Sequence, residues 1–187
     1  NLLVNLADTN PAAQDALCSD EAARALLELL GAARSPRVLS GLCLLLSHAV
    51  WNHTGNQRRF GEEPTVRSLL AFLAPAGRPT GGEWGFGGGA GAEGEGAGAA
   101  QRGELTLTAL MALVNLSYCN TRVQELIRTT GGFPLLLAQL SSPIYEVQRT
   151  ASFCLGNLVK ENAPNASEAV AAGALELLLR CLNDDDD

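Results

Sequence analysis

The feature that most constrains this chain is a pattern that returns at a fixed interval. Asn10 and Asn52 are separated by the same interval as Asn120 and Asn162, and an apolar stretch precedes each of the four. The interval between Asn52 and Asn120 is longer, and its excess falls in the glycine-rich residues 75–103. A fixed period of about 40 residues is typical of a helical solenoid, in which each repeat packs only on its neighbours.

Other positions keep the same spacing. Leucine occupies one fixed position before each of these asparagines and a second fixed position after it. The two columns are Leu3, Leu45, Leu113 and Leu155, and Leu27, Leu69, Leu137 and Leu179. Between residues 146 and 172 the apolar side chains also recur at steps of three and four, which is the spacing of one helix face. The repeat unit is therefore predicted to consist of helices.

Several residues predict where helices begin and end. Ser19 or Asp20 can cap the helix that follows, because their side-chain oxygens accept backbone N–H groups, and Gly31 suits the end of that helix. The run Asn162–Asn165 is predicted to separate two helices. Three prolines suit first helical turns, where the missing N–H costs nothing: Pro36, Pro64 and Pro134.

These residues resemble the armadillo family. The family pattern is a short helix, a glycine followed by an apolar helix, and a longer third helix that ends in an Asn-Leu pair. The matching segments here are Asn5-Leu6, Asn115-Leu116 and Asn157-Leu158, and the apolar helices Gly132–Leu137 and Ala172–Leu179. The resemblance implies an all-α fold, a right-handed α-solenoid of three-helix repeats, in which the third helices line a concave groove.

The chain is predicted to form a single repeat segment over residues 1–187. Residues 1–9 are interpreted as the end of a truncated repeat and residues 162–187 as a partial repeat, with full repeats at 10–51, 52–119 and 120–161. Residues 75–103 hold most of the 20 glycines. Glycine at this density loses too much backbone entropy to order by itself, so this stretch is predicted to be a disordered loop inserted into the second full repeat.

Composition and charge narrow the classes of function. With a net charge of −7, the chain lacks the basic face that phosphate binding needs, so no nucleic-acid partner is expected. No apolar run is long enough to span a membrane, so no membrane span is expected. Five cysteines, an odd number without a CxxC pair, favour a reducing compartment. A cytoplasmic location is therefore predicted, with the nucleus as an alternative.

No residues have the spacing of a catalytic or metal site. His48 and His53 have no acidic or thiol partner at metal or triad spacing, and both are interpreted as histidines at the edge of the core. The glycine-rich stretch contains no phosphate-binding GxxxxGK[ST] motif. No enzymatic activity, cofactor or metal is therefore expected. Trp51 is expected to cover the end of its repeat.

The Asn-Leu pairs supply the candidate binding residues. In the family that the chain resembles, this asparagine points into the groove, where an amide offers one acceptor and two donors to the backbone of an extended peptide. The residues at this position are Asn5, Ser47, Asn115 and Asn157, and Ser47 is a gap in the series. One helical turn earlier stand Cys43, Met111 and Phe153. In import receptors that resemble this pattern, a tryptophan at the earlier position packs on a bound lysine, and only Phe153 is aromatic here.

Three functions remain open. The first is a non-enzymatic scaffold or adaptor that binds an extended segment of a protein partner in the groove, and an acidic chain is compatible with a basic segment. The second is a nuclear-import-type cargo receptor for basic signals, although most of the aromatic column is missing. The third is the regulatory armadillo region of a larger multidomain enzyme. The asparagines could also serve only to brace neighbouring helices, and the oligomeric state stays open.

Overall fold

The computed structural model describes residues 10–17, 19–74 and 95–184. Within these ranges the chain forms eleven helices and no strand, which confirms the all-α class. The helices are α2 (Pro11–Leu17), α3 (Asp20–Ala32), α4 (Pro36–Val50), α5 (Thr54–Phe60), α6 (Glu63–Ala71), α7 (Glu95–Ser117), α8 (Thr121–Thr129), α9 (Gly132–Gln139), α10 (Tyr145–Val159), α11 (Ala163–Ala171) and α12 (Ala174–Asp184). None of these helices is both long and apolar enough to cross a membrane. The truncated repeat predicted at residues 1–9 lies outside the described residues.

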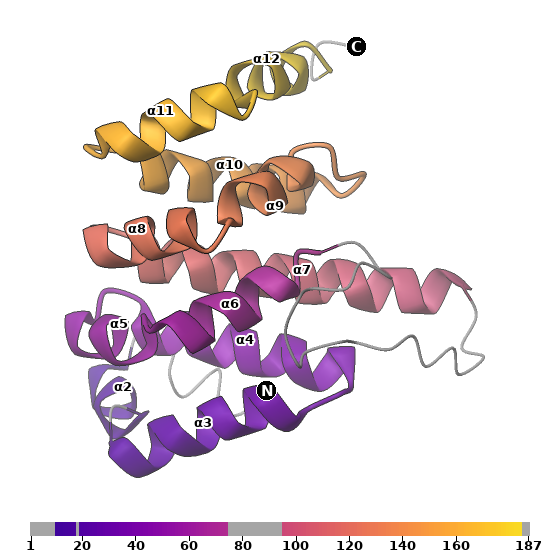
Figure 1. The fold of residues 1–187 in the computed structure, drawn as a ribbon. Coiled ribbons are helices and arrows are strands. Elements are labelled where there is room, and N and C mark those ends of the chain that lie inside the picture. The colour runs from indigo at the N-terminus through magenta and orange to yellow at the C-terminus, as the bar shows by residue number, and fades with distance from the viewer. Residues whose placement is uncertain (1–9, 18, 75–94, 185–187) are drawn as a thin grey trace.

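The helices stack in chain order as a solenoid of three-helix repeats. Figure 1 shows α2, α3 and α4 at one end of the stack, then α5 to α7, then α8 to α10, with α11 and α12 at the other end. The third helices α4, α7 and α10 form a continuous row. Contact between α4 and α7 is the most extensive between any two of the described helices, followed by contact between α7 and α10.

One apolar core runs through the stack. In the first leucine column, Leu45, Leu113 and Leu155 are all buried on third helices. In the second leucine column, Leu69 and Leu137 are buried on second helices. Each repeat covers the apolar face of the repeat before it, so these leucines mark the shared core, whereas Leu27 is half-buried and Leu179 on α12 is 59% exposed.

Most of the predicted helix ends are confirmed. Ser19 begins α3, and its hydroxyl oxygen accepts the N–H of Ala22 at 3.2 Å. Pro36, Pro64 and Pro134 each lie in the first turn of a helix. The predicted helix starts are therefore confirmed where a single capping side chain or a single proline ring determines them.

The predicted end of α3 at Gly31 is wrong. The helix continues to Ala32, and the Arg34 side chain covers its last carbonyls. The Nη1 atom donates to the oxygens of Gly31 at 2.9 Å, Ala32 at 3.0 Å and Ala33 at 3.1 Å. A guanidinium with several donors can satisfy carbonyls that helix geometry leaves unpaired, so no left-handed glycine is needed.

The break at Asn162–Asn165 is shorter than predicted. Asn162 caps α11, because its Oδ1 accepts the N–H of Asn165 at 3.2 Å. Pro164 and Asn165 therefore belong to the first turn of the helix. The chain changes direction one residue earlier, at Glu161, whose φ of 54° lies in the left-handed region.

The predicted boundary of the glycine-rich loop at residue 103 is also wrong. Helix α7 begins at Glu95, so residues 95–103 are helical, while residues 75–94 lie outside the described residues. A β carbon at Gly103 would collide with the Ile144 side chain, which packs against this turn from the next repeat. Tertiary contact of this kind stabilises a helix whose glycines have poor intrinsic helix propensity.

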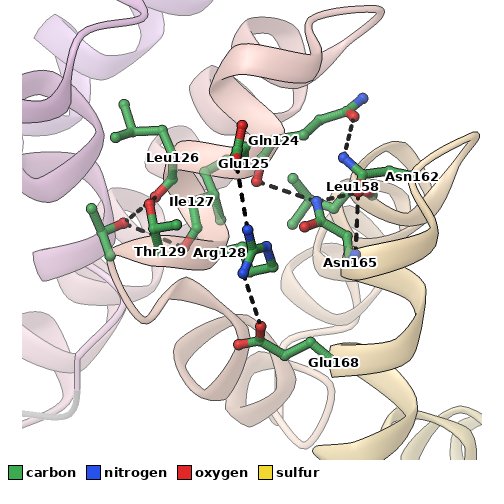
Figure 2. Close-up of polar contacts among 11 residues, drawn as sticks. Gln124, Glu125, Leu126, Ile127, Arg128, Thr129, Leu158, Asn162, Asn165 and Glu168 are labelled. Carbon is green, nitrogen blue, oxygen red and sulfur yellow. Dashed lines mark hydrogen bonds and ion pairs between the residues drawn. The ribbon is translucent and has the colours of Figure 1, made fainter.

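Side-chain amides on the first helices join successive repeats. Asn165 on α11 is fully buried, and its Nδ2 donates to the carbonyl oxygens of Leu158 at 2.9 Å and Gln124 at 3.2 Å (Figure 2). The equivalent bonds of Asn56 on α5 reach Ala49 at 2.8 Å and Gln14 at 2.9 Å. Each amide therefore ties a first helix to both the first and the third helix of the preceding repeat.

His53 begins α5 in the way that asparagines begin the other first helices. Its Nδ1 accepts the N–H of Asn56 at 3.1 Å, just as Asn120 Oδ1 accepts the N–H of Val123 at 3.3 Å. Because Nδ1 accepts, the ring proton is on Nε2, which donates to Asp15 Oδ1 at 2.9 Å. The interpretation of His53 as a histidine with a local structural role holds, and that role is a helix cap.

We expect His53→Ala to lower the free energy of unfolding by about 1 kcal/mol, because the substitution removes a helix N-cap. His53→Asn should retain most of that stability, since asparagine caps the equivalent helices α8 and α11. Chemical denaturation of both variants checks this. If His53→Asn lost as much stability as His53→Ala, the bond to the exposed Asp15 rather than the cap would be the important contact.

Candidate peptide-binding groove

A pocket of about 300 Å³ opens between the third helices α4, α7 and α10, and we call it the third-helix groove. Its lining residues are Ser47, His48, Trp51, Met111, Val114, Asn115, Thr150 and Phe153. They come from three successive repeats, because the third helices lie side by side in the stack. One large side chain of a partner has room in a pocket of this size.

The structure brings together four of the six residues predicted to bind a peptide. Ser47, Met111, Asn115 and Phe153 line the third-helix groove. Asn157 lies one helical turn beyond Phe153 on α10 and is half-buried. The sixth residue, Asn5, lies outside the described residues.

Asn115 braces two third helices. Its Nδ2 donates to the carbonyl oxygen of Ser47 at 3.0 Å and to the Ser47 hydroxyl oxygen at 2.8 Å. A backbone carbonyl can only accept, so this contact determines which end of the amide faces Ser47. Both contacts of Nδ2 are with Ser47, and no donor among the described residues reaches Oδ1. Asn115 can therefore accept a hydrogen bond from a partner through Oδ1, while its Nδ2 braces α4.

Asn157 makes the same kind of contact one repeat later. Its Nδ2 donates to the carbonyl oxygen of Val114 at 3.2 Å. This bond uses one amide hydrogen, so the second N–H and Oδ1 are not bonded within the described part of the chain. Asn157 thus combines a structural contact with the donor and acceptor that the backbone of an extended segment needs.

The position equivalent to these asparagines on α4 is His48, and the assignment of Ser47 to it is wrong. On each third helix, the backbone carbonyl at this position accepts a hydrogen bond from the Nε2 of a glutamine on a first helix. The three bonds are Gln14 to His48 at 2.8 Å, Gln57 to Asn115 at 3.0 Å and Gln124 to Asn157 at 2.9 Å. These glutamines recur once in each full repeat, and their positions are a sequence signal for the correct alignment that the asparagine spacing missed.

The same one-residue shift removes Cys43 from the groove. Cys43 is fully buried in the core, and this burial raises the pKa of its thiol to about 12. The residue one turn before His48 in the corrected alignment is Leu44, which is half-buried. Leu44, Met111 and Phe153 are therefore the equivalent residues, and only the last is aromatic.

Two groove residues were not predicted to bind a partner. Trp51 follows α4 and lines the third-helix groove with 53% of its surface exposed, although it was expected to cover the end of its repeat. His48 also lines the groove. An aromatic residue recurs directly after two third helices, because Tyr118 follows α7 as Trp51 follows α4, and Tyr118 is also 53% exposed. This recurrence is the sequence signal that would have indicated Trp51.

A polar cluster outside the third-helix groove lies between α8 and α11. Arg128 is 3.5 Å from Glu125 and 3.8 Å from Glu168 (Figure 2). A pocket of about 150 Å³ beside it is lined by Thr121, Glu125, Arg128, Asn162 and Pro164. The two carboxylates outweigh the charge of the single guanidinium, so the cluster joins neighbouring repeats and offers no excess positive charge to an anion.

The residues described by the structure contain no group of three or more His, Cys, Asp or Glu side chains that could hold a metal ion. The carboxylates that the structure places in ion pairs lie mainly on first and second helices, outside the third-helix groove. The chemistry of the groove is therefore that of apolar contact and hydrogen bonding.

No protein-family model and no curated protein matches this chain. Among solved structures it is similar to a designed armadillo repeat protein, YIII(Dq.V1)4CPAF, in complex with the peptide (KR)4. The two share 18% sequence identity and a TM-score of 0.74 over 97% of this chain. It is also similar to an engineered protein from the Northeast Structural Genomics Consortium, with 21% identity and a TM-score of 0.64 over 96% of this chain. The chain spans 65% and 42% of the lengths of these two structures. These likenesses confirm that the chain has an armadillo-like repeat fold.

Proposed function

We propose that this chain is a non-enzymatic scaffold that binds an extended segment of a protein partner in the third-helix groove. The observation that supports this most directly is the convergence of Trp51, Met111 and Phe153 from three successive repeats. Trp51 and Phe153 are 53% and 60% exposed. Large exposed apolar side chains that line one groove are typical of a protein interaction site.

The polar groups beside these side chains suit a peptide backbone. Asn115 Oδ1 can accept an N–H, and Asn157 can both donate and accept. The two asparagines stand on successive third helices, so they can contact backbone groups at successive places along an extended segment. The designed armadillo protein of similar fold was solved in complex with a peptide, which supports peptide binding by this chain.

The import-type alternative is less favoured. It needs an aromatic side chain one turn before each asparagine, to pack on the stem of a bound lysine. The corrected column is Leu44, Met111 and Phe153. A role as the regulatory region of a larger enzyme is compatible with the proposed scaffold, because a groove of this kind could bind a segment of the same protein.

The proposal can be tested by selecting binders from a displayed library of random peptides on the whole 187-residue chain. Selected peptides are then measured by fluorescence anisotropy against Trp51→Ala/Phe153→Ala. We expect binding to weaken by about 10-fold or more, because truncating an exposed aromatic anchor at an interface costs about 1.4 kcal/mol or more.

The matched control is Leu29→Ala/Leu175→Ala, which removes two side chains of similar exposure, 55% and 57%, from second helices. This control should bind the selected peptides like the wild type. The helical content and the unfolding midpoint of both double variants should stay close to those of the wild type. If the control variant lost binding and the groove variant kept it, the binding site would lie on the second helices and the proposal would be wrong.

A further inference from the structure

No carboxylate among the described residues lines the third-helix groove. None of its eight lining residues is Asp or Glu, although the chain has 20 acidic residues and only 13 Lys and Arg residues. The acidic residues on and next to α10, Glu146 and Glu161, lie at the two ends of this helix and do not line the groove. The local charge of the groove therefore differs from the charge of the whole chain.

A cation stands at the edge of the groove. Arg149 lies one helical turn before Phe153 on α10, is exposed, and places its guanidinium carbon 6.0 Å from the centre of the Phe153 ring. No carboxylate among the described residues lies within ion-pair distance of Arg149. Contact with the ring orients the guanidinium beside the groove while its donors stay available to an anionic group.

The apolar lining of the third-helix groove determines which kind of partner side chain can enter it. Trp51, Met111, Val114 and Phe153 surround the 300 Å³ volume, with Ser47, His48, Asn115 and Thr150 as the polar neighbours. An aromatic side chain of a partner would fill this volume and stack against an aromatic neighbour at low entropy cost. A lysine or arginine there would lie beside Arg149 without a carboxylate to pair with.

We infer that the third-helix groove selects an extended segment that carries an aromatic residue next to Asp or Glu. The aromatic side chain enters between Trp51 and Phe153, and the carboxylate pairs with Arg149. The inference rests on the proposed function and specifies its partner. It also sets this groove apart from the designed protein of the same fold, which was solved with the basic peptide (KR)4.

The test uses four labelled peptides and fluorescence anisotropy with the whole chain. The first is Ser-Asp-Glu-Phe-Asp-Glu-Ser, the second has Lys-Arg in place of each Asp-Glu pair, the third is the first with Ala in place of Phe, and the fourth is (Lys-Arg)4. We expect the first to bind best. Arg149→Glu should weaken its binding by about 10-fold at low salt and by less at high salt, because charges at an exposed rim are screened.

The matched control is Arg58→Glu, which changes the net charge by the same amount at an exposed residue on α5. It should leave the order of the peptides unchanged, whereas Arg149→Glu should shift the preference toward the basic aromatic peptide. Tighter binding of a basic peptide to the wild type, abolished by Phe153→Ala, would overturn the inference and leave the proposed function standing. Equal binding of all four peptides, or of none, would also overturn it, and the library selection would then decide the proposed function separately.

Discussion

Replacing Asn165 with alanine should lower the free energy of unfolding by about 2–3 kcal/mol, because two buried carbonyl groups lose their donor. Asn165 is fully buried, and its Nδ2 donates to Leu158 and Gln124, one on α10 and the other on α8. The Asn165 Oδ1 has no partner in the core, so its removal offsets a small part of the loss. The bonds join two repeats, and the effect should therefore exceed that of losing a hydrogen bond within one helix.

Chemical denaturation of Asn165→Ala beside Ser167→Ala measures this effect. Ser167 is exposed on the same helix, and surface substitutions of this kind usually change stability by less than about 0.5 kcal/mol. A loss in Asn165→Ala as small as that in Ser167→Ala would show that the amide contributes nothing to the contact between repeats. Helical content should stay close to that of the wild type in both variants under native conditions.

Replacing Gly132 with alanine is the second substitution with a large expected effect, about 2–3 kcal/mol of lost stability, because it overpacks a tight contact between helices. Gly132 begins α9 and is buried. A β carbon there would lie 2.6 Å from Ile127 Cγ2 and 2.7 Å from the Ile127 backbone oxygen, with Leu70 Cδ2 at 3.2 Å. The backbone oxygen belongs to α8 and cannot rotate away as a side chain can, so α8 and α9 must separate.

Gly156→Ala is the matched control for Gly132→Ala. Gly156 lies inside α10, is exposed, and would have no atom within 4 Å of an added β carbon. It should stabilise the chain by about 0.5–1 kcal/mol, because alanine favours a helix over glycine. The two variants should therefore shift the unfolding midpoint in opposite directions. A midpoint in Gly132→Ala equal to that of the wild type would mean that α8 and α9 are not in close contact.

The repeat period predicted the fold because each of its signals is local. Leucines at fixed spacing mark the face that each helix buries, and Leu45, Leu113 and Leu155 are indeed in the core. The capping role of Ser19 depends only on its neighbours in the chain, and it too was predictable. The start of α7 was not, because residues 95–103 are rich in glycine and their helix packs against Ile144, which belongs to the next repeat.

The alignment of the second repeat shows the limit of spacing alone. Asn52 and His53 are adjacent, and either residue type can precede a helix. His53 is the one that caps α5, and Gln57 then reaches the carbonyl of Asn115. The shift moves the groove position from Ser47 to His48. The asparagine spacing alone does not decide between the two, since both lie on the same helix, whereas the positions of the glutamines favour His48.

The sequence by itself determined that this chain is a stack of helical repeats, because apolar residues recur at helical spacing within each repeat. It also indicated Met111, Asn115 and Phe153, which the structure brings together in one groove. Only the tertiary structure decided which hydrogen-bonding groups of the two asparagines remain available to a partner. It also decided that Trp51 lines the same groove. The physical reason is that a shift of one residue turns a side chain by about 100° around the helix axis. Packing between repeats, and not spacing along the chain, determines which side chains face the groove.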